Sequence, residues 1–332
     1  MLKNFAITGC GRISHRHAVQ ISKVGKLKAV CDIIPERANE LAVLYSATPY
    51  YTLEDLLTAE KGIDIISICT PNGLHARHTI LSLEAGINVL CEKPLCIQVS
   101  DGHDMIAAAA KHGKKLFVVK QNRYNPPVVF LRELINSNQL GSIFSFQVNC
   151  YWNRPPGYYT DWKGKKMMDG GTLYTQFSHF IDLVYWLLGD VNVVHSITKN
   201  YAHPSIEFED TGILSFSMKS GVIGCMNYTV NSHQKNMEGS ITVFAEKGTI
   251  KIGGEYLNEM EYFNVQGMEA PVLAKGNPAN SYGFYQGSMS NHDKVYENLL
   301  KALDDPSNDL ANAEEGLKTV AIIESIYGAP TA

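Results

Sequence analysis

The amino-acid sequence predicts an α/β protein: a doubly wound parallel sheet in the N-terminal part, followed by an α+β part with an open, mainly antiparallel sheet. In the first 120 residues, short apolar runs alternate with helical patterns, which is typical of parallel strands joined by crossover helices. From about residue 143, strand-like runs follow one another without helices between them, which is typical of antiparallel pairing. We place the domain boundary between residues 122 and 123, giving domains 1–122 and 123–332.

The N-terminal elements follow one another in a regular order. Expected strands cover residues 5–8, 27–31, 64–69, 88–91 and 115–119. Expected helices cover residues 12–24, 35–45, 53–59, 74–85 and 99–112. Ligands of doubly wound sheets bind beyond the carboxyl ends of the strands, so the residues that follow each strand are the candidates for a binding site.

The C-terminal part is dominated by strands. Expected strands cover residues 143–152, 192–200, 211–218, 222–229, 240–246 and 249–253, and expected helices cover 173–188, 291–303 and 313–327. The proline-containing stretch 124–127 is expected to be the hinge between the domains. The sequence leaves open whether the last two helices pack on the second domain or return to the first.

Composition excludes several classes of function. The 332 residues are 45% hydrophobic and 19% charged, with a net charge of −4, and no basic stripe runs along an expected helix. Nucleic-acid and membrane binding are therefore not expected. No apolar stretch has the length of a membrane span, and the seven cysteines show no zinc-binding spacing. We expect a cytoplasmic protein with reduced thiols and no metal site.

A glycine-rich turn lies between the first expected strand and the first expected helix. Gly9 permits the tight turn, and Gly11 allows the backbone to approach a pyrophosphate at the helix N-terminus, beside Arg12 and Ile13. Ser14 stands where a third glycine or an alanine is usual, which loosens the packing of helix on strand. The order strand, glycine turn, helix predicts dinucleotide binding.

An acidic residue ends the second expected strand. Asp32 follows Gly9 by twenty-three residues, the position from which a carboxylate accepts hydrogen bonds from both ribose hydroxyls and repels a 2′-phosphate. NAD is therefore favoured over NADP. The alternative is a glycine turn next to a solvated aspartate with no cofactor.

One lysine follows the strand at 88–91. Lys93 stands between Glu92 and Pro94, on the edge of the sheet where the dinucleotide's reactive ring should lie. A lysine in a water-poor cleft beside a positively charged nicotinamide has a lowered pKa, which suits it to proton transfer. The alternative is an ordinary solvated lysine at a strand end.

The expected helix 173–188 carries a polar stripe on an otherwise apolar surface. Thr175, His179 and Asp182 stand at i, i+4 and i+7, and buried polar groups need hydrogen-bond partners. A substrate is one candidate partner, and a satisfied core histidine is the alternative. The pair Gly170-Gly171 ahead of the helix permits close backbone approach and favours the first.

Four motifs together resemble the Gfo/Idh/MocA oxidoreductases over essentially the whole chain. They are the glycine turn, Thr70-Pro71-Asn72, Glu92-Lys93-Pro94, and the helix with His179-Phe180-Ile181-Asp182. The resemblance implies a Rossmann domain followed by a domain whose open sheet often forms oligomer contacts, hence a homo-oligomer (a dimer or tetramer). It also implies that Lys93 lies beside the nicotinamide and the substrate hydroxyl, and that His179 completes the acid/base pair.

The resemblance and the strand-end positions give two sets of expected contacts. The residues expected to contact NAD are Gly9, Gly11, Arg12, Ile13, Asp32, Thr70, Pro71, Asn72, His75, Glu92, Lys93 and Gln121. The residues expected to contact the substrate are Asn122, Arg123, Tyr151, Arg154, Tyr159, Thr175 and His179.

One departure from the family pattern concerns the substrate. Many inositol and glucose dehydrogenases of the family carry an aspartate where this chain has Thr175, so Lys93 becomes the leading general base and His179 assists. The surrounding segments resemble a branch that oxidises the 3-hydroxyl of UDP-N-acetylglucosaminuronic acid for bacterial surface polysaccharide (O-antigen) synthesis. The loss of an acid suits a uronate, and Arg123 and Arg154 are available for its carboxylate or for the diphosphate.

Three questions stay open at this stage. Some enzymes of that branch reoxidise NADH in place with 2-oxoglutarate, and the sequence does not decide whether this chain does. A dehydrogenase of another sugar or of inositol is the nearer alternative. A regulator that binds NAD without turnover is the alternative from another class; it has no need of a reactive lysine, so the presence of both Lys93 and His179 favours an enzyme.

Overall fold

The computed structural model describes residues 2–283, 285–305 and 312–328. The chain forms two compact units that are interleaved along the sequence. The first unit contains residues 1–120, 167–170 and 292–321, and the second contains 121–166, 171–291 and 322–332. The domain boundary at 122/123 therefore stays a prediction. Among the described residues, no helix has the length and apolar character needed to cross a membrane.

The first unit is built on a six-stranded parallel sheet in the order β3-β2-β1-β4-β5-β6. The strands are β1 (Lys3–Thr8), β2 (Gly25–Cys31), β3 (Thr48–Tyr50), β4 (Ile65–Ile68), β5 (Asn88–Cys91) and β6 (Leu116–Val118). The predicted parallel sheet is confirmed, and the short edge strand β3 is an addition to it. Strand order reverses between β1 and β4, where ligands bind in doubly wound sheets.

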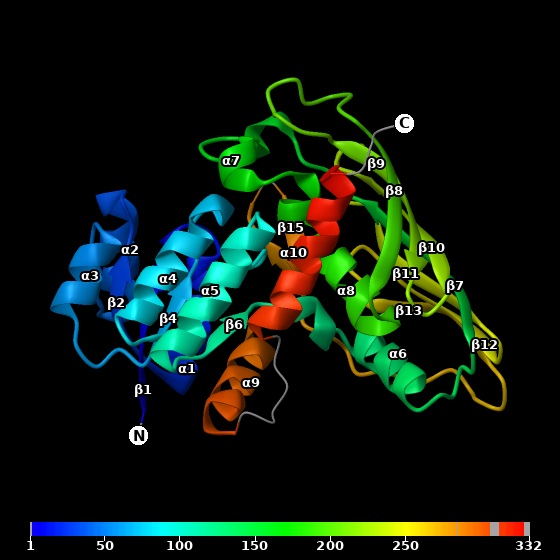
Figure 1. Cartoon of the computed structure of the whole chain (residues 1–332), viewed down its shortest axis with the longest axis horizontal. Helices are drawn as coiled ribbons and strands as arrows, with labels where there is room; N and C mark the ends of the chain where they lie inside the picture. The colour runs from blue at the N-terminus through cyan, green and yellow to red at the C-terminus, as the bar shows by residue number, and fades with distance from the viewer. Residues whose placement is uncertain (1, 284, 306–311, 329–332) are drawn as a thin grey trace. The chain divides into compact units, whose positions relative to one another are not determined.

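Helices connect these strands (Figure 1). They are α1 (Ser14–Val24), α2 (Pro35–Tyr45), α3 (Leu53–Ala59), α4 (His75–Glu84) and α5 (Val99–His112), and α9 (His292–Asp304) belongs to the same unit. Right-handed crossovers run outward from the sheet centre in both directions, so α1 and α4 cover opposite faces. Helix α4 packs against α5, and α1 packs against α9.

Burial on both faces explains why the central strands of this sheet are rich in apolar residues. Phe5, Ile7, Ile65 and Ile68 are all fully buried. Burying each such side chain contributes about 1.5–3 kcal/mol, which fixes the sheet beneath the loops at its carboxyl edge.

The second unit is built on a seven-stranded sheet in the order β13-β12-β11-β7-β10-β9-β8. The strands are β7 (Ile143–Tyr151), β8 (Val191–Lys199), β9 (Thr211–Met218), β10 (Ile223–Thr229), β11 (Glu238–Ala245), β12 (Gly248–Gly253) and β13 (Glu259–Val265). Only β7 and β10 pair in parallel, so the prediction of an open, mainly antiparallel sheet is confirmed. A separate hairpin joins β14 (Ala279–Ser281) and β15 (Gln286–Met289).

Helices α6 (Pro126–Asn136) and α8 (Ser178–Leu188) lie along one face of this sheet (Figure 1), and we call the opposite face of the sheet its outer face. The ring of Trp152, which directly follows β7, lies 5.3 Å from that of Phe177 and 5.8 Å from that of Phe180. The hinge at 124–127 stays a prediction, and in the structure this stretch lies in the second unit. Pro126 begins α6, because the fixed φ of proline suits the first turn of a helix.

The predicted helix 173–188 is not a uniform α-helix. Its first five residues, Leu173–Phe177, form a π-helical turn (η4) that continues into α8, and the last helix is α10 (Ala313–Gly328). Hydrogen bonds in a π-turn run from i to i+5, so the regular spacing assumed for Thr175 and His179 does not hold there. Such turns occur often at functional sites.

Candidate active site

The glycine turn of the first unit has room for a ligand. Gly9 has φ of +89°, and a Cβ there would lie 2.6 Å from the backbone of Cys69 and Thr70, so close approach to the end of β4 requires glycine. A Cβ on Gly11 would meet no described atom within 4 Å. This open space beside the start of α1 fits the pyrophosphate of a dinucleotide.

Asp32 is held beside this turn by backbone amides. Its two carboxylate oxygens accept hydrogen bonds from the N–H of Cys10, at 2.7 Å, and of Ile34, at 2.8 Å. Arg12 is exposed on the turn, and Ile13 is the residue before α1. The carboxylate is therefore oriented at the carboxyl end of β2, where a ribose is expected.

His75 links the loops that follow β4 and β5. One ring nitrogen lies 2.7 Å from the carbonyl oxygen of Pro94 and the other 2.9 Å from that of Thr70, which precedes Pro71. Burial lowers the pKa of His75 although both carbonyls favour its protonated form. Asn72 donates to the carbonyl of Asp169 at 2.8 Å. The side chains of His75 and Asn72 thus have hydrogen-bond partners within the protein, which explains their placement without a contact to NAD.

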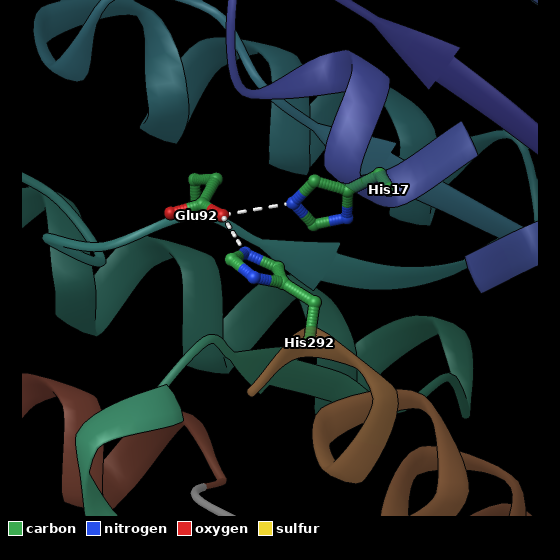
Figure 2. A group of neighbouring side chains, drawn as sticks. All are labelled: His17, Glu92 and His292. Atoms are coloured by element: carbon green, nitrogen blue, oxygen red, sulfur yellow. Dashed lines mark hydrogen bonds and ion pairs between the residues drawn. The ribbon is translucent and has the colours of Figure 1, made fainter. Parts of the chain in front are cut away.

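Lys93 follows β5 and is half-buried, and its peptide bond to Pro94 is cis. Its backbone N–H donates to one carboxylate oxygen of Glu92 at 3.1 Å. The other oxygen of Glu92 contacts His17 and His292, as Figure 2 shows. The predicted NAD contact of Glu92 thus has a competing explanation, because both oxygens of this buried carboxylate are engaged within the first unit.

The second unit holds a buried amide without a partner. Gln121 and Asn122 lie in a short 3-10 helix (η2, Gln121–Tyr124), and the amide nitrogen of Gln121 lies 3.5 Å from Nε2 of His179 and 3.2 Å from the hydroxyl of Ser288. Neither amide atom of Asn122 has a hydrogen-bond partner among the described residues, although the side chain is buried. Such a group costs about 1–3 kcal/mol, which a bound ligand would relieve.

Arg123 is engaged by Asp182. Its guanidinium forms a bidentate pair with this carboxylate at 2.8 and 2.7 Å, and both side chains are buried. Arg123 is thus the hydrogen-bond partner that the buried Asp182 of the polar stripe needs. Arg123 was predicted to be available for a substrate anion; its geometry instead indicates a structural ion pair between η2 and α8.

Arg154, in contrast, is a buried cation with no carboxylate within ion-pair distance among the described residues. Its Nε donates to the amide oxygen of Gln176 at 2.6 Å, and its Nη1 to that of Asn236 at 3.3 Å. The guanidinium lies 5.0 Å from the ring centre of Trp152 and 5.1 Å from that of Tyr285. Burial lowers the pKa of Arg154, because the charged guanidinium is removed from water. An anion bound beside it would compensate this loss of hydration.

The two tyrosines predicted to contact the substrate differ in placement. The ring of Tyr159 lies 5.1 Å from that of Tyr158, which stacks near Arg154. Tyr151 alternates along β7 with the buried Cys150, so it faces the opposite side of the sheet from α8. The structure therefore does not bring Tyr151 to the face of the sheet on which α8 and His179 lie.

Comparison with known proteins agrees with this description. Residues 3–120 match the family model described as "Oxidoreductase family, NAD-binding Rossmann fold", and residues 128–251 match the "GFO/IDH/MocA C-terminal domain". The first unit thus contains an NAD-binding Rossmann fold, and the motifs at its strand ends are those of oxidoreductases.

Two solved structures match nearly the whole chain. The WlbA dehydrogenase from Bordetella pertussis is 32% identical, with 99% of this chain and 96% of that one covered and a TM-score of 0.88. The WlbA dehydrogenase from Chromobacterium violaceum is 34% identical, with 99% and 93% covered and a TM-score of 0.89. Both were crystallised with NADH and UDP-GlcNAcA.

Curated relatives act on sugars and inositols. D-glucoside 3-dehydrogenase of Escherichia coli is 28% identical, over 67% of this chain and 66% of that protein. The scyllo-inositol 2-dehydrogenase (NADP(+)) of Bacillus subtilis is 25% identical, over 83% of this chain and 78% of that protein. Both of these relatives are named as dehydrogenases of a sugar derivative or an inositol.

Proposed function

Because this chain belongs to the Gfo/Idh/MocA oxidoreductase family and is an NAD-dependent sugar dehydrogenase, we propose that it oxidises the 3-hydroxyl of UDP-N-acetylglucosaminuronic acid (UDP-GlcNAcA) to a ketone. The observation that carries the proposal is the identity of 32% and 34%, over 99% of the chain, to two dehydrogenases crystallised with this sugar nucleotide. The glucoside and inositol dehydrogenases are less similar and match less of the chain.

The charge of the second unit supports an anionic substrate. Arg154 is a buried guanidinium without a carboxylate partner among the described residues. The uronate carboxylate or the diphosphate of the substrate would supply an anionic partner. Its partner Gln176 lies in η4, the same five-residue turn that carries Thr175. Because Thr175 replaces an acid, this turn carries no negative charge that would repel the uronate.

Asn122 supports a hydroxyl-rich ligand. An amide can both donate to and accept from a sugar, and the buried amide of Asn122 does neither with any described residue. Together with Tyr159 and Thr175, it would orient the ring by hydrogen bonds rather than by charge.

The proposed reaction needs a base for the hydroxyl proton and a hydride acceptor. NAD, when bound, accepts the hydride that leaves C3. Lys93 takes the proton of the 3-hydroxyl, and His179 shares that proton or orients the hydroxyl. The pyrophosphate and ribose of NAD would be held by Gly9, Gly11 and Asp32. Holding them would fix which face of the nicotinamide ring is presented to the sugar.

We further propose a homo-oligomer built on the outer face of the second unit's sheet. Ile197, Ile213 and Ile223 are 59%, 54% and 61% exposed on the neighbouring strands β8, β9 and β10, and Ile197 is the register partner of Ile213. A sheet face with exposed branched apolar side chains is typical of an interface. A cytoplasmic role in surface polysaccharide synthesis fits the sugar nucleotide.

The direct test is the absorbance of reduced nicotinamide when the protein is mixed with NAD and UDP-GlcNAcA, with and without 2-oxoglutarate. A signal supports the substrate, and its loss on adding 2-oxoglutarate supports recycling of the cofactor in place. Methyl glucosides and inositols are the comparison substrates. A larger kcat/KM for one of these would replace the proposed substrate while leaving the sugar dehydrogenase assignment intact.

A further inference from the structure

A buried chain of hydrogen bonds in the first unit ends at Glu92, the residue before Lys93. His17 on α1 and His292 at the start of α9 both point Nε2 at the same oxygen of Glu92, at 2.8 and 3.3 Å (Figure 2). The other ring nitrogen of His17 lies 2.8 Å from the hydroxyl of Tyr296, which lies 2.9 Å from that of Ser67. All five side chains are buried.

The direction of each hydrogen bond in this chain can be derived from Glu92. Burial raises the pKa of Glu92, but hydrogen bonds from His17 and His292 hold it well below its ordinary value, so the carboxylate is charged and only accepts. Burial lowers the pKa of His17, which favours the neutral ring. A neutral His17 that donates from Nε2 to Glu92 accepts at Nδ1 from the hydroxyl of Tyr296, and Tyr296 in turn accepts from Ser67.

This chain fixes the turn that carries Lys93. With one oxygen of Glu92 held by the two imidazoles, the second oxygen is placed to accept from the backbone N–H of Lys93. On the other side of the lysine, His75 contacts the carbonyl of Pro94. The N–H of Lys93 is thus tied to Glu92, which His17 and His292 hold in place, and the carbonyl of Pro94 is tied to His75 on α4.

We propose that His17 and His292 are positioning residues for catalysis: through Glu92 they hold the backbone of Lys93, and so determine where its ammonium or amine can reach. The inference rests on the proposed role of Lys93 in proton transfer. The position of Lys93 affects the rate strongly, because a displacement of about 1 Å of a reacting group can reduce a rate by about 100-fold.

The same three residues also have the composition of a metal site. Their ligand atoms lie within 4.8 Å of one another. Nδ1 of His292 has no hydrogen-bond partner among the described residues, however, whereas metal-binding histidines almost always donate from their second nitrogen. We therefore argue the hydrogen-bonded arrangement, and metal content becomes one outcome of the test.

The test compares His292→Leu with His292→Gln, because the glutamine amide can still donate to Glu92. We expect kcat to fall by about 10- to 100-fold in His292→Leu, with the Kd for NAD within about threefold of wild type, and the glutamine variant to recover most of the loss. Tyr296→Phe, which removes only the hydroxyl that orients His17, should give a smaller loss of kcat. His103→Leu, an exposed histidine on α5, is the matched control.

Wild-type kcat in folded His292→Leu and Tyr296→Phe, checked by thermal melting, would overturn the inference. So would an equal loss in the leucine and glutamine variants, or a stoichiometric metal ion in the wild type that is lost in His292→Leu. The assay uses whichever sugar the wild type oxidises, so a wrong substrate leaves it intact. If Lys93→Met is inactive while the histidine variants are unaffected, the function stands and this inference alone fails.

Discussion

The polar groups around the glycine turn and Lys93 differ from those of Asn122 and Arg154 in whether the protein itself satisfies them. In the first unit, the carboxylates of Asp32 and Glu92 and the ring of His75 all bond to described residues around the glycine turn and Lys93. In the second unit, the amide of Asn122 has no described partner and the cation of Arg154 has no described carboxylate. On the proposed function, the residues around the cofactor are preformed, whereas those around the substrate are completed by their ligand.

The largest effect is expected at Lys93. Lys93→Met keeps the length of the side chain but removes the base, so kcat should fall by about 10²–10⁴-fold. The Kd for NAD, measured by fluorescence titration, should change little, because the glycine turn and Asp32 are untouched. Turnover near the wild-type rate would remove Lys93 from the mechanism.

The next largest effect is expected at Arg154. Arg154→Met should lower kcat/KM for UDP-GlcNAcA by about 100-fold, because a desolvated ligand anion would lose its partner. Arg123→Met is the matched comparison: it breaks the buried pair with Asp182, so it should lower the melting temperature strongly. If Arg154→Met lowers stability as much as Arg123→Met and leaves kcat/KM unchanged, the contrast between these arginines is lost.

A smaller effect is expected at Asn122. Asn122→Leu removes an amide that has no described partner, so the free enzyme should be as stable as the wild type or more stable. The KM for the sugar should nevertheless rise by about tenfold, since the ligand loses its hydrogen bonds. A large fall in melting temperature would show that the amide is satisfied within the protein.

The smallest effect on turnover is expected at the outer sheet face. Ile213→Glu places a charge beside Ile197 and should shift the mass in light scattering toward the monomer, with kcat changed less than about threefold. An unchanged mass would place the interface elsewhere or show that the wild type is monomeric.

Local patterns explain how much of the fold and the site was predictable. The parallel sheet and the placement of Gly9 and Asp32 at its edge follow from strands, helices and a glycine turn that are adjacent in sequence. The chain from His17 to His292 could not be predicted, because its hydrogen bonds join residues that are at least 75 positions apart and meet only after folding. The pairing of Arg123 with Asp182 is non-local in the same way.

Two predictions used the local pattern incompletely. The prolines at 126–127 were interpreted as part of a hinge, and Pro126 also begins α6, because proline suits the first turn of a helix. Tyr151 was predicted to contact the substrate from the resemblance to the family, whereas alternation along β7 directs it to the face of the sheet opposite α8. This alternation was present in the sequence.

The measurement that tests the central claim most directly is the fate of a deuterium placed at C3 of the sugar of UDP-GlcNAcA. After incubation with the enzyme and NAD, mass spectrometry of the nucleotide and the nicotinamide product would locate the label. The account predicts that deuterium leaves the sugar and appears on the reduced nicotinamide, together with a 3-keto sugar nucleotide. Reduced nicotinamide without deuterium, formed while the sugar keeps its label, would contradict it.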